Sequence, residues 1–228
     1  MKKTLGAYLI EVLEARGVRH VFGIPGVHNL ELYRGLAASR IRHVAARHEQ
    51  GLGFMADGYA RVSGRPGVCF TITGPGLTNI VTAMGQAYGD SIPLVVIASE
   101  NRRGEFGSGR GFLHEMPDQL GVAARVSGMS RRVTAPEQLP EALDLALAGA
   151  VGQRPRPSYI EIPRDVITED ATGLPAPTGP AGAAALTAAI LARRAEAAKA
   201  VEGGAKVAAQ DPEALPGIPR AEGVLIVE

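Results

Sequence analysis

The sequence predicts an α/β protein with a doubly wound, mainly parallel sheet, helices on both faces and a C-terminal tail. Two observations predict this fold. Segments with helical periodicity alternate with short apolar segments typical of buried strands, and such alternation favours a parallel sheet with right-handed crossovers. The 228 residues are also 46% hydrophobic and 21% charged, which is enough for one full core plus a fragment of something else.

The first half of the chain supplies two strands and three helices ahead of the central strands. Thr4 is suited to cap a first helix, which ends near Gly17. The apolar face of this helix comprises Leu5, Leu9, Val12 and Leu13. The expected elements that follow are a strand at 21–24, a helix at 30–36, a strand from Ile41 and a helix at about 48–62.

The second half repeats the alternation. Its expected elements are a strand at 67–72, a helix at 77–88, a strand at 94–97, a helix at about 136–150 and a strand at 159–162. Residues 94–97 are continuously apolar, as expected for a strand that is buried on both faces.

The composition changes after Asp170. We expect a domain at 1–170, then an exposed linker at 171–182, which is rich in Pro, Gly, Thr and Ala. Residues 183–228 are expected to form an Ala/Pro-rich tail or the truncated start of a central domain, with a thinly packed helix at 183–201 and a strand at 223–228.

Charge and cysteine content restrict the partners and the compartment. A formal net charge of +1 gives no electrostatic reason to expect a nucleic acid or a membrane as partner. The single cysteine, Cys69, excludes an intrachain disulfide, and its apolar neighbours indicate a small buried side chain. Glu11 and Glu14 interrupt the only stretch that could imitate a signal peptide, so we expect a cytoplasmic protein.

Glu49 is the most informative residue. It follows the apolar segment 41–46, which is expected to be a buried parallel strand, and open α/β sheets bind ligands at the carboxyl ends of their strands. A carboxylate at the mouth of an apolar crevice loses hydration and can exchange a proton with a bound ring nitrogen near neutral pH. The alternative is a glutamate in the first turn of a helix that complements the helix dipole. Position alone leaves both interpretations open.

Two glycine-rich turns also follow predicted strands. Residues 23–26 form a turn that allows close backbone approach, although a plain strand-to-helix connection would look the same. Residues 73–76 precede a helix, where free amide groups can bind an anion or the polar edge of a ring, and Asn79 is expected in the first turn of that helix.

Two other kinds of site are disfavoured. Residues 51–56 fit the dinucleotide fingerprint, but that fingerprint needs an acid about 20 residues later and residues 68–73 contain none. Its glycines are also expected within a helix rather than before it. The histidines show no paired ligand spacing, so we expect no metal site in this chain. They are His20, His28, His43, His48 and His114.

Six short motifs occur in one order over about residues 4–168. They are 21–26 (VFGIPG), 47–51 (RHEQG), 56–61 (ADGYAR), 73–79 (TGPGLTN), 90–93 (DSIP) and 159–166 (YIEIPRDV). Together they resemble the pyrimidine-binding domain of thiamine-diphosphate-dependent enzymes, most closely those like acetolactate synthase. The resemblance implies a thiamine-diphosphate enzyme that decarboxylates or carboligates a 2-oxo acid.

The resemblance also implies roles for individual residues. Glu49 is implied to be catalytic: it hydrogen-bonds N1′ of the aminopyrimidine and favours its imino tautomer, whose nitrogen removes the thiazolium C2 proton. The implied cofactor-binding residues are Ile24, Pro25, Gly26, Glu49, Thr73, Gly74, Pro75 and Asn79.

The Gly-rich segment 104–112 is too rich in glycine for regular structure and suits a loop that closes over a carboxylate substrate, although a plain surface loop fits equally well. His114 stands where acetolactate synthases carry an active-site glutamine, and this departure leaves the substrate open. The candidate substrate residues are Phe106, Arg110 and His114.

In this family, Mg²⁺ and the diphosphate are held by a Gly-Asp-Gly motif on a second domain, and this sequence has no such motif. The chain is therefore expected to be a half-site that acts as a homo-oligomer or with a partner subunit carrying a diphosphate-binding domain. FAD is suggested by analogy with acetolactate synthases alone. The alternatives are a noncatalytic relic or interaction module of the same fold, and a generic α/β nucleotide-binding protein.

Overall fold

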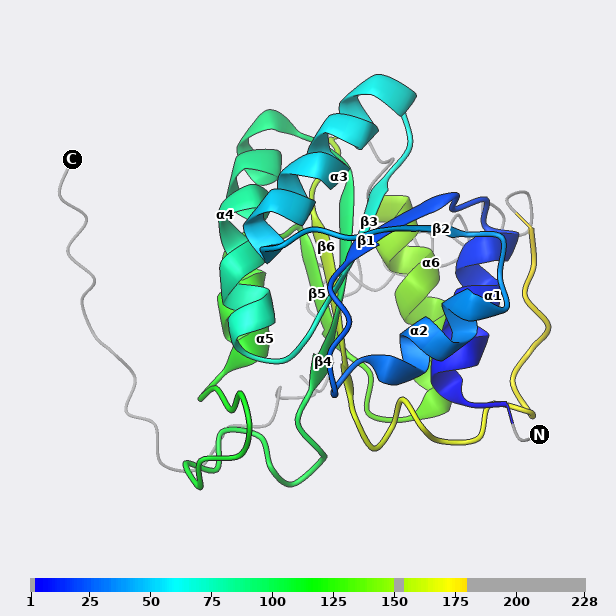
Figure 1. Ribbon diagram of the computed structural model, residues 1–228, viewed down its shortest axis with the longest axis vertical. Helices are drawn as coiled ribbons and strands as arrows, with labels where there is room; N and C mark the ends of the chain where they lie inside the picture. Colours follow the sequence, from blue (N-terminus) through cyan, green and yellow to red (C-terminus); the bar gives the residue numbers. More distant parts are fainter. Residues whose placement is uncertain (1–2, 150–153, 180–228) are drawn as a thin grey trace, which may run out of the picture. The chain divides into compact units, whose positions relative to one another are not determined.

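The computed structural model describes residues 3–149 and 154–179 (Figure 1). Within these ranges it forms a six-stranded sheet in the order β2-β1-β3-β4-β6-β5, and every neighbouring pair is parallel. The strands are β1 (His20–Gly23), β2 (Arg42–Val44), β3 (Gly67–Thr71), β4 (Leu94–Glu100), β5 (Met129–Arg132) and β6 (Ser158–Pro163). The helices are α1 (Leu5–Ala15), α2 (Leu30–Ala37), α3 (Glu49–Ser63), α4 (Pro75–Asp90), α5 (Gln119–Ala124) and α6 (Leu139–Gly149), with a short 3₁₀ helix at Pro136–Gln138.

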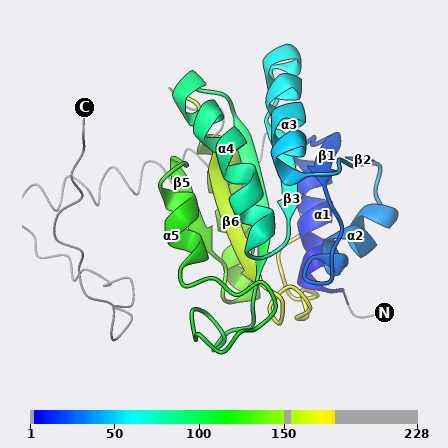
Figure 2. The same cartoon turned by 60° about the vertical axis from the view of Figure 1, so that its left-hand side comes forward.

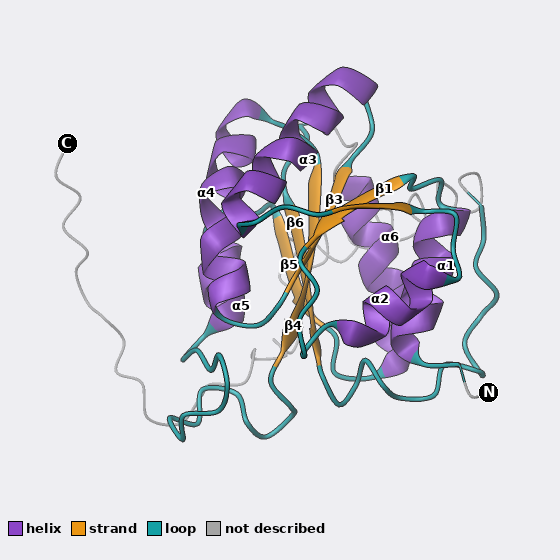
Figure 3. Cartoon of the chain, in the orientation of Figure 1, coloured by secondary structure: helices purple, strands orange, loops and turns teal. Residues whose placement is uncertain are grey.

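The helices cover both faces of the sheet, so the predicted doubly wound α/β fold is confirmed (Figure 3). Helices α1, α2 and α6 pack on one face, and α3, α4 and α5 pack on the other. Figure 2 shows α4 between α3 and α5 on the second face. Cys69 is buried there as a free thiol, as predicted, and burial raises its pKa.

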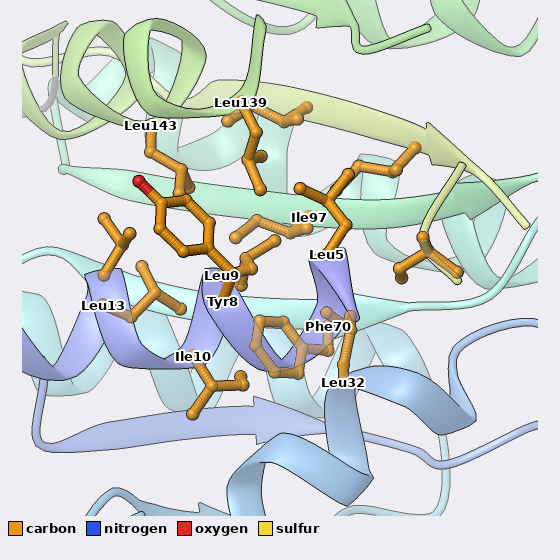
Figure 4. Packing of buried hydrophobic residues seen from close by; sticks show 14 of the residues in the cluster. Leu5, Tyr8, Leu9, Ile10, Leu13, Leu32, Phe70, Ile97, Leu139 and Leu143 are labelled. Atoms are coloured by element: carbon orange, nitrogen blue, oxygen red, sulfur yellow. The ribbon is translucent and has the colours of Figure 1, made fainter. Parts of the chain in front are cut away.

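The core of the first face is built around α1 (Figure 4). The helix begins as predicted, because the Thr4 hydroxyl accepts the backbone N–H of Ala7 at 3.3 Å. The N–H groups of Leu5 and Gly6, which lack partners within the helix, donate to carbonyls of Glu169 and Ile167 at 2.9 Å. The start of the domain is therefore bonded to its end. The labelled core side chains are Leu5, Tyr8, Leu9, Ile10, Leu13, Leu32, Phe70, Ile97, Leu139 and Leu143.

On the second face, glycines allow α3 to approach its neighbours closely. A Cβ atom on Gly53 would lie 2.6 Å from the Ala83 Cβ and 2.8 Å from Cγ1 of Ile80 on α4. A Cβ atom on Gly67 of β3 would lie 2.5 Å from the carbonyl oxygen of Ala56. Helix α3 is thus fixed against both α4 and β3 by contacts that tolerate no side chain.

The order of the strands reverses between β1 and β3. From β1 the chain passes through α2 to β2 on one side, and from β3 it passes through α4 to β4 on the other. Helices α2 and α4 lie on opposite faces, so the connections after β1 and β3 diverge (Figure 1). In open α/β sheets, ligands bind outside the carboxyl ends of the strands at such a point.

Three local expectations differ from the structure. The strand from Ile41 is parallel, but β2 is an edge strand on which Arg42 and His43 are exposed, so its predicted burial was wrong. Helix α4 begins at Pro75, which places Asn79 in its second turn rather than its first. The sequence also missed α5 and β5: α5 has six residues, too few for a clear period, and β5 reads Met-Ser-Arg-Arg.

The segment expected as an exposed linker contacts the domain over its described part. Ala171 is 1% exposed, and the carbonyl of Pro175 accepts the Tyr8 hydroxyl at 2.9 Å. Arg16 donates to Asp144 from Nε at 2.9 Å and also to Thr178. The expectations for residues 180–228 lie outside the described residues. In the part of the chain that is described, no helix is long and apolar enough to cross a membrane.

Two buried carboxyl groups lie together at the carboxyl edge of the sheet. Glu161 pairs in register with Ala98, and Glu100 is two residues beyond Ala98, so both glutamates face the α3–α5 side. They are 0% and 4% exposed. Arg132 donates from Nε to Glu161 at 2.5 Å. Burial and the negative charge of Glu161 raise the pKa of Glu100 to about 7.

The contact at Gly53 predicts opposite effects for two substitutions in one helix. Gly53→Ala should lower the free energy of unfolding by about 1–3 kcal/mol, because the added methyl group would clash with Ile80 and Ala83 of α4. Gly58→Ala is the matched control, since a Cβ there meets nothing within 4 Å, and it should raise stability by up to about 1 kcal/mol. Urea unfolding measures both, and equal effects would contradict the close contact.

The raised pKa of Glu100 predicts that stability falls with pH. The protonated carboxyl group stabilises the folded state. This contribution is fully present below pH 4.5, the ordinary pKa of the group, and is lost as the pH rises through about 7. Glutamine does not ionise, so in Glu100→Gln the decrease in the free energy of unfolding between low and neutral pH should be smaller by up to about 3 kcal/mol. The amide oxygen of the glutamine can still accept the Asn101 N–H. Urea unfolding across this pH range gives the measurement. The exposed control Glu137→Gln should retain the wild-type pH dependence, and parallel curves for all three proteins would disprove the prediction.

Candidate functional site

Glu49 lies at the carboxyl edge of the sheet as the first residue of α3. The imidazole of His48 caps this helix by accepting the N–H of Gln50 at 3.2 Å. Glu49 is 9% exposed, and its Oε2 accepts a hydrogen bond from Nδ2 of Asn79 at 2.9 Å. The carboxylate is therefore in the first turn of a helix, where the dipole stabilises negative charge, and is also buried and oriented by a second helix.

The packing of α3 on α4 sets the geometry of this pair. Gly53 follows Glu49 by four residues, and Ala83 follows Asn79 by four residues. Residues four apart lie on the same face of a helix, so the Gly53–Ala83 contact is one turn below the Glu49–Asn79 hydrogen bond. The close approach of the two helices thus brings the amide to the carboxylate. The position of α3 also excludes a dinucleotide-binding turn at residues 51–56. Gly51 and Gly53 lie inside the helix, whereas the fingerprint needs its glycines in a turn before the helix.

The turn after β1 is held by a buried asparagine. Asn29 is 0% exposed; its Oδ1 accepts the N–H of Gly26 at 2.8 Å and its Nδ2 donates to the carbonyl of Ile24 at 3.2 Å. Pro25, between them, is exposed. A Cβ on Gly26 would lie 2.7 Å from Cγ2 of Ile72, so this turn packs directly against the residue that precedes Thr73.

His28 joins the turn after β1 to the turn after β3. It is 3% exposed, and its Nδ1 lies 2.8 Å from Oγ1 of Thr73, which is fully buried. Its Nε2 is buried and has no hydrogen-bond partner among the described residues. Burial, assisted by the positive charge of Arg164, lowers the pKa of His28. The neutral imidazole therefore keeps one ring nitrogen free to bond a ligand.

His28 is not among the residues that the sequence motifs predicted for the site. The available signal was its place just after a glycine turn at the carboxyl end of the first strand. The predicted residue His114 approaches the same point, since its ring centroid is 5.8 Å from that of His28. The structure thus gathers residues from three separate connections: His28 after β1, Thr73 after β3 and His114 after β4.

Gly74 has a conformation and an environment that only glycine fits. It has φ +62° and caps α4, and a Cβ atom there would lie 2.2 Å from the carbonyl oxygen of His114. Its N–H donates to Oε1 of Gln119 at 2.6 Å. Pro75 follows as the first residue of α4, where its missing N–H costs nothing. The predicted turn 73–76 is therefore tightly fixed by the segment that follows β4.

The Gly-rich segment 104–112 contains no helix or strand, as expected, and extends away from the sheet (green in Figure 1). Glu115 organises it by accepting the Ser108 hydroxyl at 2.8 Å and three backbone N–H groups, and these hydrogen bonds lower the pKa of Glu115. Phe106 stacks on the guanidinium of Arg132, with the ring centroid 4.2 Å from Cζ, and Arg110 is exposed. Of the three candidate substrate residues, His114 is the one whose ring approaches His28, whereas Phe106 lies at the end of β5.

Metal ligands do not gather in this region. Within residues 3–149 and 154–179, no three His, Cys, Asp or Glu side chains are placed to hold a metal ion. Near the turns after β1 and β3, the polar groups are instead the Glu49 carboxylate oriented by Asn79, the neutral imidazole of His28, the buried Thr73 and the glycine-rich backbone. Groups of this kind can fix the orientation of a polar ligand through hydrogen bonds.

Residues 3–122 match the thiamine pyrophosphate enzyme family, N-terminal TPP binding domain. The chain is 58% identical over 164 residues to the Pseudomonas aeruginosa protein named "Probable 2-ketoarginine decarboxylase AruI", covering 72% of this chain and 29% of that protein. It is 41% identical over 175 residues to an acetolactate synthase of Arthrospira platensis, covering 73% of this chain and 29% of that enzyme. It is 40% identical over 169 residues to acetolactate synthase isozyme 1 large subunit of Escherichia coli, covering 73% and 30%.

The chain spans about 30% of the length of these relatives. The matched residues include α3 with Glu49 and the three connections that meet at the carboxyl edge. The chain belongs to the thiamine pyrophosphate enzyme family and carries its N-terminal TPP-binding domain, in an acetolactate-synthase-like form.

Proposed function

We propose that this chain binds the aminopyrimidine half of thiamine diphosphate, as part of a 2-oxo acid decarboxylase or carboligase. One observation carries the proposal: a carboxylate that is 9% exposed stands at the start of α3, at the carboxyl edge of the sheet, and is oriented by Asn79. Such a group can hold or release a proton at a fixed position, which is the requirement for general acid–base work on a ring nitrogen.

The residues at this edge fit an aminopyrimidine ring. Glu49 offers a carboxylate oxygen besides the one that Asn79 bonds, which can accept a proton from the ring. The buried Nε2 of His28, which lacks a partner within the described ranges, offers one further hydrogen bond to cofactor or substrate. The turns after β1 and β3 offer backbone groups and the exposed ring of Pro25. The proposed cofactor-binding residues are Ile24, Pro25, Gly26, Glu49, Thr73, Gly74, Pro75 and Asn79.

Glu49 and Asn79 have separate tasks in the proposed reaction. Glu49 exchanges the proton, and Asn79 keeps its carboxylate in one rotamer. Burial reduces the hydration of Glu49, which strengthens its interaction with a charged ring nitrogen. Thiamine diphosphate supplies the carbanion chemistry of 2-oxo acid decarboxylation when it is bound.

The diphosphate half of the cofactor needs residues that the described ranges do not provide. Mg²⁺ requires oxygen ligands as well as phosphate, and no acidic cluster of that kind is present in them. We therefore propose that residues 1–170 supply a half-site, and that a diphosphate-binding domain from a partner subunit or from another part of a homo-oligomer completes it. FAD is not part of this proposal.

The names of the relatives suggest which substrate to test first. The relative that is 58% identical is named as a 2-ketoarginine decarboxylase, so we propose a 2-oxo acid with a guanidinium side chain. His114, whose ring approaches His28, is the principal proposed substrate residue, and Phe106 and Arg110 act from the loop that precedes it.

Glu49→Gln tests the catalytic role. The amide oxygen of glutamine can still accept the Asn79 hydrogen bond, but it cannot exchange a proton, so kcat should fall by at least about 100-fold in the enzyme assembled with its diphosphate-binding part. Carbon dioxide release measures this. The control is Glu141→Gln, which alters an exposed glutamate in the first turn of α6 and should leave the rate unchanged. Full activity in Glu49→Gln, or no thiamine-dependent activity in the wild type, would refute the proposal.

His114→Gln tests the substrate assignment by installing the residue that acetolactate synthases carry. Because the ring lies beside His28 and the rest of the site is unchanged, KM for the guanidinium substrate should rise at least about tenfold, whereas the Kd for thiamine diphosphate should change little. Steady-state kinetics and calorimetry separate the two quantities. An unchanged KM would remove His114 from the substrate site, and Glu141→Gln, which alters an exposed glutamate of α6, is the control that should leave KM unchanged.

A further inference from the structure

The turn at Thr73 and Gly74 depends on a residue that does not belong to the site itself. Gly74 has φ +62° and ψ −107°, a conformation that helix α4 cannot impose, because Gly74 precedes the first helical residue. Its N–H points to Gln119, and the N–H···Oε1 distance between the heavy atoms is 2.6 Å. Gln119 is the first residue of α5, 45 positions along the chain.

Gln119 is held in one orientation by both ends of its amide. It is 1% exposed. While Oε1 accepts from Gly74, Nε2 lies 3.0 Å from the Ser99 carbonyl, 3.0 Å from the Tyr159 hydroxyl and 3.3 Å from a Glu161 oxygen. A flipped amide would place its NH₂ group against the Gly74 N–H and lose every acceptor. The network therefore fixes which atom faces Gly74.

The partners of Gln119 are themselves anchored. The Tyr159 hydroxyl donates to Glu161 at 2.9 Å, and Arg132 donates to the other oxygen of the same carboxylate. Strands β4 and β6 and the edge strand β5 supply these groups, so Gln119 rests on three strands of the sheet. A buried polar network in which every member is bonded is rigid.

We propose that Gln119 is a positioning residue that transfers the rigidity of the sheet to the turn at Thr73 and Gly74. Through this hydrogen bond it fixes the start of α4 and, with it, the direction of Thr73 toward His28. Its effect on cofactor binding rests on the proposed function, whereas its effect on the shape of the turn does not. Gln119 makes no direct contact with the ligand in this proposal.

Amide hydrogen exchange in the full chain tests the effect on the turn without any ligand. Gln119→Leu removes the acceptor while keeping a side chain of similar size, so the Gly74 amide should exchange at least about tenfold faster, and the Val96 amide in β4 should be unaffected. The control is Gln138→Leu. This exposed glutamine also accepts a backbone N–H, that of Thr134 at 2.8 Å, and its loss should leave Gly74 unchanged.

A milder variant keeps the test decisive if Gln119→Leu does not fold. Tyr159→Phe deletes a single hydroxyl and removes one of the three acceptors of the Gln119 NH₂ group, so Gly74 should exchange at a rate between those of wild type and Gln119→Leu. If the Gly74 amide exchanges at the wild-type rate in both variants, or in Tyr159→Phe when it alone folds, the positioning role is disproved.

The functional consequence is measured separately in the assembled enzyme. The Kd for thiamine diphosphate should rise at least about fivefold in Gln119→Leu and stay unchanged in Gln138→Leu. Faster exchange at Gly74 with an unchanged Kd would show that the turn is held by Gln119 but does not bind the cofactor, which would overturn the functional part. Loss of the proposed function would instead be seen in the wild type, as absence of thiamine diphosphate binding.

Discussion

The close contact between α3 and α4 is the constraint on which the rest of the site depends. Gly53 has no side chain because α4 occupies the space that a Cβ atom would need, and one turn higher the same approach brings Asn79 to the Glu49 carboxylate. A helix pair spaced by an ordinary side chain, about 8–10 Å apart, would separate that amide from that carboxylate. The close packing in the core and the orientation of Glu49 at the carboxyl edge therefore both depend on the absence of a side chain at Gly53.

The strand order adds the second element. Because the chain leaves β1 and β3 toward opposite faces, their connections diverge at the carboxyl edge, and this leaves room there for side chains from both. His28 and Thr73 meet at this point, and the segment after β4 brings His114. The buried network of Gln119, Tyr159 and Glu161 supports the turn from below, so residues expected to touch the ligand rest on residues that do not.

The sequence was informative where a pattern is local. The alternation of helix and strand, the cap at Thr4 and the burial of Cys69 follow from neighbouring residues, and the structure agrees with them. Glu49 could be selected because an acid follows within three residues of the segment 41–46, which was expected to be a buried strand. The contacts of His28 and Gln119 could not be predicted, because their partners are 45 residues away and only the folded sheet brings them together. The burial of β2 was predicted wrongly because it also depends on distant residues: β2 lies at the edge of the sheet, and that position is set by the order of all the strands.

Native mass spectrometry of the protein purified from its own cells tests the central claim most directly. It records the mass of the chain, its partner subunits and any bound cofactor in one experiment. Our account predicts thiamine diphosphate in an assembly that contains a diphosphate-binding domain, and loss of that cofactor mass when the assembly is separated into isolated copies of this domain. An assembly with such a domain but without thiamine diphosphate, or this chain alone and free of cofactor, would contradict the account.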